Sequence, residues 1–359
     1  MVKWYSQSVS LFSCMTPLVF MQIPWHGWQK KGMMRKCRMY LRFPAMRTKC
    51  YPGGFTMSKT NGTTTACTLC PRRCGADRAA GEKGFCGETV ALRVGRAGLH
   101  LWEEPCITGK SGSGTVFFAG CTLRCVYCQN HELLRSGAGI LTGEDRLVSI
   151  FFELAEKGAS NINLVTPDHF IPQIVPAVRI ARENGLSLPF VWNLSGYETV
   201  EQIRMIGDCA DVYLTDLKYL DPELAAKYSY APDYPETAKA ALAEMVRRRP
   251  FLQYDADGLL REGVIVRHLL LPSHVNASKA VLRYLHDTYD SRILVSIMNQ
   301  YTPRPGIETE YPELERRVTK REYDRLVDYA ISLGMENAFI QEGPTALESF
   351  IPAFDGEGV

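Results

Sequence analysis

The sequence predicts an α/β fold, an incomplete (β/α)6-type barrel that follows a small N-terminal cysteine-rich metal-binding segment. Three observations support this prediction. From Thr115 onward, short β-rich runs alternate with amphipathic stretches of helical length, which is typical of βα units around a mostly parallel sheet. The 359 residues are 46% hydrophobic, which is enough for a large core. Several of the 12 cysteines are closely spaced, which in a chain of this size indicates metal ligation.

The composition also excludes several classes of protein. Disordered and collagen-like chains do not have this apolar content. No uninterrupted apolar run reaches the roughly 18 residues of a membrane span, and the net charge of +2 gives no reason to expect nucleic acid. We therefore expect neither a membrane nor a nucleic acid as partner. Without a convincing secretion signal, we expect free thiols and a cytoplasmic location.

The first 56 residues differ in composition from the rest of the chain. They hold nine Lys and Arg but no Asp or Glu, whereas the remainder has a net charge of −7. We interpret Met57 as the true start and residues 1–56 as a non-native or disordered leader. The alternative is a targeting segment, because Lys3 precedes an apolar stretch, but prolines break that stretch and no A-x-A cleavage pattern follows. The expected divisions are 1–56, a cysteine-rich segment at 57–110 and the partial barrel at 111–359.

Periodicity predicts the elements of the barrel in order. Strands are expected at 115–120, 161–166, 189–193, 211–216, 263–271 and 292–298, with a short last strand at 337–341. Helices are expected around 147–154 and at 172–184, 198–206, 235–248 and 278–287, with a last one that opens at the capping box of Thr319 and Glu322. In such barrels the chemistry gathers at the C-terminal ends of the strands.

Three cysteines directly follow the first predicted strand. Cys121, Cys125 and Cys128 have the spacing C-x3-C-x2-C. Three thiolates from one short loop can hold three irons of a [4Fe–4S] cluster, and the loop offers no fourth cysteine, so one iron would be open to a small molecule. The alternatives are a zinc site, although structural zinc usually has four protein ligands, or three packing cysteines.

This loop, its place after the first barrel strand and the βα series resemble the radical S-adenosylmethionine (SAM) superfamily. Within it, the chain resembles the pyruvate formate-lyase activating enzyme-like branch, especially relatives with an N-terminal cysteine-rich segment. The resemblance runs from Cys67 to the C-terminus. It is carried by CTLCPRRC, GSGTVFFAGCTLRCVYCQN, NINLVTPDHF, NLSGYE, DVYLTDLKY, VIVRHLLLP and SIMNQYTP.

The resemblance implies cofactors, ligands and partners. SAM would chelate the open iron, and its reductive cleavage would give a 5′-deoxyadenosyl radical that abstracts hydrogen from an unidentified substrate. The positions that match those lining the methionyl end of SAM are Asn193, Asp216, Lys218 and Arg267, and Gln300 is expected near the nucleoside. The implied partners are an electron donor such as flavodoxin or ferredoxin and, in one version, a glycyl radical enzyme as protein substrate. No catalytic residue is assigned.

The end of the second predicted strand departs from the family pattern. Many members have a Gly-Gly-Glu segment there whose backbone meets the SAM amino group, whereas this chain has VTPDHF at 165–170. We expect the Thr166 hydroxyl or local carbonyls to replace those contacts. His169 is either a substrate-side acid or base or, as a lone histidine more often is, a structural residue. Asp216 and Lys218, likewise, could simply pair with each other.

A second cysteine set precedes the barrel. Cys67, Cys70, Cys74 and Cys86 lie in glycine-rich sequence that can fold closely around a metal. Four thiolates complete either a zinc or an iron site, and spacing does not choose between them. We expect a structural metal, with an auxiliary iron–sulfur cluster as the alternative. The lone cysteines 106 and 209 are expected to be buried thiols.

Two other classes of function remain as alternatives to a radical SAM enzyme. One is an iron–sulfur electron-transfer or metal-scaffolded binding protein without SAM chemistry, which predicts full protein ligation of its cluster. The other is a zinc-only protein, which predicts no colour and no labile sulfide.

Overall fold

The computed structural model describes residues 66–135, 137–341 and 352–359. The predicted leader and residues 57–65 lie outside the described residues. Within the described ranges, no helix combines the length and the hydropathy that a membrane span requires. The cysteines in these ranges are all free thiols.

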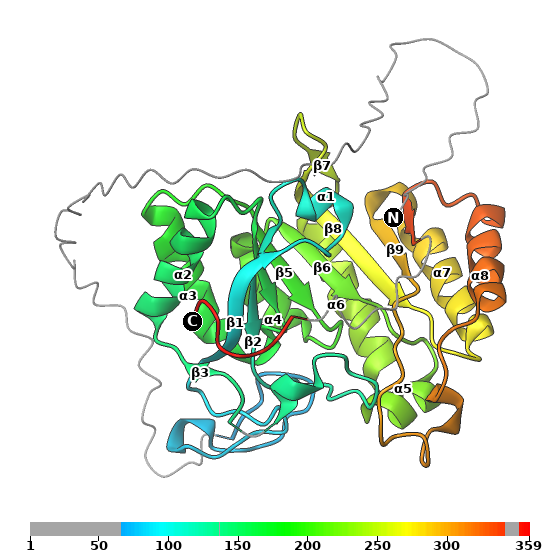
Figure 1. Cartoon of the computed structure of the whole chain (residues 1–359), viewed down its shortest axis with the longest axis horizontal. Helices are drawn as coiled ribbons and strands as arrows, with labels where there is room; N and C mark the ends of the chain where they lie inside the picture. Colours follow the sequence, from blue (N-terminus) through cyan, green and yellow to red (C-terminus); the bar gives the residue numbers. More distant parts are fainter. Residues whose placement is uncertain (1–65, 136, 342–351) are drawn as a thin grey trace, which may run out of the picture. The chain divides into compact units, whose positions relative to one another are not determined.

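A single sheet with the strand order β10-β9-β8-β6-β5-β4-β2-β1-β3 forms the centre of the described part (Figure 1). Its parallel strands agree with the predicted runs. They are β2 (Ser113–Phe118), β4 (Ile162–Val165), β5 (Phe190–Leu194), β6 (Val212–Asp216), β8 (Leu260–Leu269), β9 (Leu294–Met298) and β10 (Ala338–Ile340). Among the described strands, β10 and β3 end the order without pairing to each other, so the sheet is an open, partial barrel.

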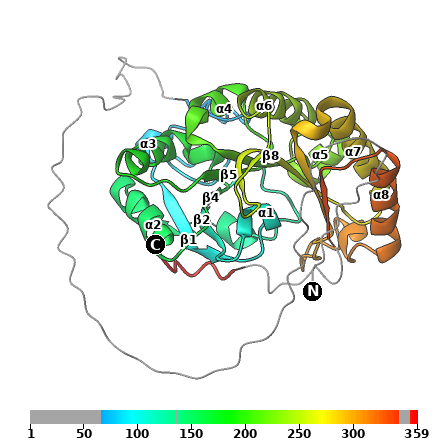
Figure 2. The same ribbon diagram turned by 90° about the horizontal axis from the view of Figure 1, so that it is seen from above.

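Helices join successive strands and form an arc around the outside of the sheet (Figure 2). They are α2 (Glu144–Glu156), α3 (Ile171–Glu183), α4 (Val200–Ile206), α5 (Pro222–Ser229), α6 (Tyr234–Arg248), α7 (Val275–Tyr289) and α8 (Lys320–Ser332). The capping box that opens α8 is confirmed, because Glu322 N–H donates to the Thr319 side chain and the Glu322 carboxylate accepts from Thr319 N–H. Helix α5 is absent from the sequence prediction, and its N-terminus is capped by Asp221.

Three strands of the structure have no counterpart in the prediction. They are β1 (Arg93–His100), β3 (Ile140–Leu141) and β7 (Gln253–Tyr254). Strand β1 contains two glycines and an alanine, residues with low strand propensity, so its sequence gives no β signal. It forms by antiparallel pairing with β2, in which Ala97 lies opposite Val116. Residues 352–359, at the C-terminus, add a further contact to β1, because Ala97 N–H donates to Glu357 C=O at 2.8 Å.

The two ends of the barrel differ in chemistry. The short helix α1 (Pro105–Thr108), in the connection from β1 to β2, inserts Cys106 and Ile107 among apolar residues of β5, β6 and β8. This insertion closes the end of the barrel from which the parallel strands start. In Figure 1, α1 and β7 lie at the upper edge, whereas the cysteine-rich segment, in blue, lies at the lower edge. Arg267 of β8 reaches back to this insertion, because its Nη1 forms an ion pair with Glu103, just before α1, at 3.7 Å.

Candidate active site

The loop after β2 carries the three cysteines at a tight turn of the backbone. Gly120 and Arg124 have positive φ values of 79° and 56°, which let the chain reverse direction twice. Leu123 N–H donates to Cys121 Sγ at 3.4 Å, and the N–H of Asn130 is hydrogen bonded to Cys128. Amide groups directed at sulfur stabilise the negative charge of ligated thiolates, as in many iron–sulfur sites.

The charges around these thiols suit a ligand set that ionises only when it binds metal. Burial raises the pKa of Cys121, with Asp168 and the neighbouring thiols acting in the same direction. Burial and Cys125 together raise the pKa of Cys128 to about 11. The cation of Lys218 acts in the opposite direction on Cys128. Among the described residues, no group of three or more His, Cys, Asp or Glu side chains is arranged as around a bound ion. Protonated thiols have no attraction to a common centre until an ion replaces their protons.

Four of the five predicted SAM ligands form one hydrogen-bonded network at the strand ends. Arg267 of β8 donates from Nε to Asp216 Oδ1 at 3.0 Å and from Nη2 to Asn193 Oδ1 at 2.6 Å. Lys218 Nζ donates to the other oxygen of Asp216 at 2.5 Å. The parallel register places Asp216 opposite Arg267, so the strands themselves bring these charges together.

Electrostatics keeps this network ionised. Burial by itself would raise the pKa of Asp216, but Lys218 and Arg267 hold that pKa below its ordinary value. Burial would likewise lower the pKa of Lys218, and Asp216 raises it instead. The Asp216–Lys218 pairing is therefore present, and Arg267 shares it. A fixed carboxylate between two fixed cations can bind the ammonium and carboxylate groups of an amino acid.

Gln300 is separate from this network but lies beside the cysteine loop. Its backbone C=O accepts a hydrogen bond from Gln129 Nε2 at 2.7 Å, and Gln129 directly follows Cys128. The structure thus brings all five predicted ligands to the same end of the barrel as the three cysteines.

The four cysteines of the N-terminal set also lie near one another. Cys70 and Cys86 are buried, Cys67 is half-buried and Cys74 is exposed. The segment that carries them contacts the loop after β2 directly, because Cys121 N–H donates to Cys86 C=O at 3.1 Å.

Comparison with known proteins identifies the central part of the chain. Residues 115–251 match the radical SAM superfamily. These residues form a radical SAM domain. It includes the three-cysteine loop, Asn193, Asp216 and Lys218, whereas Arg267 and Gln300 lie beyond the matched range.

Two further similarities carry little information about function. An uncharacterized protein of Methanocaldococcus jannaschii is 27% identical over 271 residues, which cover 74% of each chain. A solved structure of a probable 2-pyrone-4,6-dicarboxylic acid hydrolase from Acinetobacter baumannii, with citric acid bound, covers 68% of this chain and 87% of its own. Its identity is 12% and its TM-score 0.28, so this likeness carries no argument.

His169 of the radical SAM domain has the burial and the contacts of a residue packed inside the barrel. It is buried, and its Nε2 donates to Ala119 C=O at 2.7 Å while its ring lies against Phe170. Burial lowers its pKa to about 4, so the ring is neutral near pH 7. Thr166, at the preceding strand end, has a φ of 58°, and its N–H donates to Asn193 C=O at 3.0 Å.

The radical SAM domain also contains buried polar groups that the sequence analysis missed. Ser229 Oγ, at the end of α5, is hydrogen bonded to Cys125 Sγ at 2.9 Å and to Tyr219 at 3.0 Å. Ser195 Oγ bridges the buried carboxyl groups of Asp168 and Glu198 at 3.0 Å each. Ser229 is 104 residues from Cys125 in the chain, and no local motif indicates such a contact.

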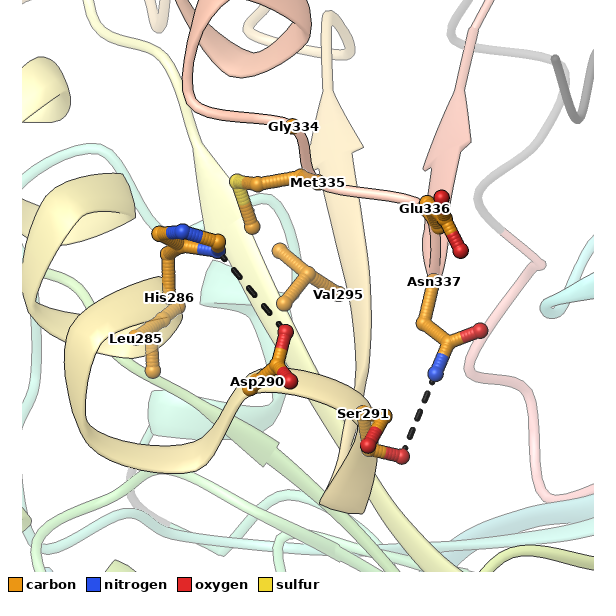
Figure 3. A pocket seen from close by; sticks show the side chains of 9 residues that line it. All are labelled: Leu285, His286, Asp290, Ser291, Val295, Gly334, Met335, Glu336 and Asn337. Atoms are coloured by element: carbon orange, nitrogen blue, oxygen red, sulfur yellow. Dashed lines mark hydrogen bonds and ion pairs between the residues drawn. The ribbon is translucent and has the colours of Figure 1, made fainter. Parts of the chain in front are cut away.

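A surface hollow of about 280 Å³ lies away from these residues (Figure 3). It is bordered by the end of α7, the start of β9 and the residues just before β10, where Asn337 Nδ2 donates to Ser291 C=O at 3.1 Å. These are the N-terminal ends of the strands, so the hollow is at the edge of the sheet opposite the cysteine loop.

Proposed function

We propose that this chain is a radical SAM enzyme in which Cys121, Cys125 and Cys128 hold a [4Fe–4S] cluster with one open iron. The observation that carries the proposal is the shared position of the loop and the charged network. Ser229 joins Cys125 to Tyr219, the neighbour of Lys218, through hydrogen bonds of 2.9 Å and 3.0 Å. The radical SAM domain supports the class of enzyme. When bound, such a cluster supplies the electron that cleaves SAM to methionine and a 5′-deoxyadenosyl radical.

We assign the binding of the methionyl group to the network of Asn193, Asp216, Lys218 and Arg267. The carboxylate of Asp216 provides an acceptor for an ammonium group, and the positive charges of Lys218 and Arg267 attract a carboxylate. Asn193 holds Arg267 in its orientation through the 2.6 Å hydrogen bond. Gln300, held beside the loop by Gln129, is assigned to the nucleoside end.

Substrate and electron donor form a separate part of the proposal. A reduced flavodoxin- or ferredoxin-type protein is the expected donor. Activation of a glycyl radical enzyme, by hydrogen abstraction from a backbone glycine, is suggested by the family resemblance alone.

The first experiment measures 5′-deoxyadenosine after anaerobic reconstitution, reduction and addition of SAM. We expect product with the wild-type protein and none above background with Cys128→Ala. An intact cluster that neither binds nor cleaves SAM would favour an electron-transfer protein, the alternative function, in which protein ligands complete the cluster.

A binding experiment tests the assigned network without relying on turnover. Asp216→Asn removes the carboxylate that two buried cations share, so we expect at least ~10-fold weaker SAM binding by equilibrium dialysis. Asp257→Asn, in the exposed turn before β8, is the matched control and should bind SAM as the wild type does. Equal affinity of the two variants would contradict the assignment of Asp216.

A further inference from the structure

Two tight backbone turns shape the N-terminal cysteine segment. In the first, Cys67 and Ala76 pair through Cys67 N–H to Ala76 C=O at 3.1 Å, and Gly75 N–H donates back to Cys67 C=O at 3.1 Å. In the second, Gly87 N–H donates to Gly84 C=O at 2.9 Å. The first turn contains Cys67, Cys70 and Cys74, and the second contains Cys86, which lies between Gly84 and Gly87 in the sequence.

The sulfur atoms of this segment converge. A Cβ atom at Gly84 would lie 3.2 Å from Cys74 Sγ and 3.3 Å from Cys86 Sγ, so both sulfurs approach the same point of the backbone, and glycine leaves them in place there. The Cys67 side chain is hydrogen bonded to Cys74. Cys70 is within electrostatic range of the other three thiols.

The segment has almost no apolar core of its own. Between residues 66 and 91, the buried apolar side chains are Cys70, Ala76 and Cys86, two of which are the cysteines themselves. The cysteines form no disulfide. Small segments that lack a hydrophobic core generally need a disulfide or a metal to hold their conformation, and here four free thiols lie near one another.

The same segment fixes the backbone of the loop after β2. Arg72 donates to Thr122 C=O at 2.8 Å and to Ser229 C=O at 2.8 Å, and its guanidinium lies 4.1 Å from the centre of the Phe85 ring. Cys86 C=O accepts from Cys121 N–H. A change in the shape of this segment therefore acts directly on the residues around Cys121.

We propose that Cys67, Cys70, Cys74 and Cys86 form a second metal site, with thiolates as its ligands, and that its occupation fixes the loop that carries Cys121. Zinc and iron both fit four thiolates. The metal site itself goes beyond the proposed function and does not depend on it. The effect on the loop rests on the proposed cluster at Cys121, Cys125 and Cys128.

The site is tested in a full-length variant from which the first set is removed. The variant C121A/C125A/C128A, expressed with added zinc and iron and purified without oxygen, should retain about one equivalent of zinc or an iron–sulfur centre with labile sulfide. Either metal supports the site, and the sulfide assay distinguishes the two. A folded protein with neither metal would overturn it.

Single substitutions then assign the ligands. Adding Cys74→Ser, at the exposed member of the set, should remove the retained metal with the least disturbance of folding. Adding Cys209→Ala, a buried cysteine outside both sets, is the control and should leave the metal content unchanged. Circular dichroism confirms that each variant is folded. Equal metal in the Cys74 and Cys209 variants would contradict the assignment.

The effect on the loop is measured in the otherwise wild-type chain. Cys74→Ser should lower the iron retained by the first site several-fold after desalting, relative to Cys209→Ala. Full iron retention in Cys74→Ser, with the second metal lost, would overturn the coupling while leaving the metal site intact. If the Cys209→Ala control itself forms no cluster, the failure lies in the proposed function instead.

Discussion

The two cysteine sets are adjacent but are built in opposite ways. Cys121, Cys125 and Cys128 lie on a loop that barrel elements hold from several sides, for example through Val126 N–H to Tyr228 C=O at 2.9 Å. The N-terminal set lies in turns with almost no apolar core. The comparison predicts that the barrel holds its cysteine loop without a cofactor, whereas the small segment needs its proposed metal to keep its conformation.

The largest expected effect is a loss of activity, with little loss of stability, when a cysteine of the loop after β2 is replaced. Cys128→Ala should lower 5′-deoxyadenosine formation by at least ~100-fold, because a cluster ligand is lost. The metal-free forms of this variant and the wild type should differ by less than about 4 °C in Tm, because the barrel holds the loop. Turnover and calorimetry measure the two effects, and retained turnover would refute the ligand assignment.

The N-terminal set should show the reverse contrast. Cys86→Ala removes a proposed metal ligand from a segment without a core, so we expect a loss of about 3 kcal/mol and roughly 5–10 °C in Tm. Cys209→Ala should cost clearly less. Calorimetry of the metal-loaded proteins is the measurement, and a Tm equal to that of Cys209→Ala would remove the distinction between the two sets.

His169 lies between the two regions and makes stability depend on pH. Its Nε2 contacts Ala119 of the loop, and its C=O accepts from Arg78 of the cysteine segment at 3.0 Å. Burial lowers its folded pKa to about 4 from 6.5, while Asp168 raises it and Arg78 lowers it. The unfolded chain therefore binds a proton first as the pH falls, and stability is lost between pH 6.5 and about 4.

Replacement of this histidine isolates its share of the pH dependence. His169→Gln keeps a donor for Ala119 but cannot titrate, so the stability lost between pH 7 and pH 5 should be about 2 kcal/mol smaller than in the wild type. Urea unfolding at the two pH values measures the loss. An unchanged pH dependence in His169→Gln would mean that another group titrates.

The smallest expected effect concerns the support of one cluster ligand. Ser229→Ala removes the hydroxyl that is 2.9 Å from Cys125 Sγ. Loss of about 1 kcal/mol of hydrogen bonding to the thiolate corresponds to a midpoint potential roughly 40 mV more negative. A redox titration followed by electron paramagnetic resonance is the measurement. Tyr213→Phe, which removes a buried hydroxyl without a hydrogen-bond partner, is the control and should leave the potential unchanged.

The parallel strands, and the residues that lie at their ends, could be predicted from the sequence. Buried parallel strands give short apolar runs, and a parallel register brings residues such as Asn193, Asp216 and Arg267 to one edge. Strand β1 could not be predicted because its glycines weaken the β signal. Helix α5 could not be predicted because eight residues give little periodicity. Arg72 and Ser229 could not be found from the sequence, since their contacts join segments 50 and 104 residues apart.

At Gly120 the barrel and the N-terminal cysteine segment are so close that there is no space for a side chain. Its φ is 79°, and a Cβ atom there would lie 2.7 Å from both Cys86 C=O and the Glu88 side chain. Two lengths of backbone thus touch with no clearance for even a methyl group. Any other residue at this position would push the cysteine segment away from the barrel, so the two regions keep this backbone contact only with glycine here.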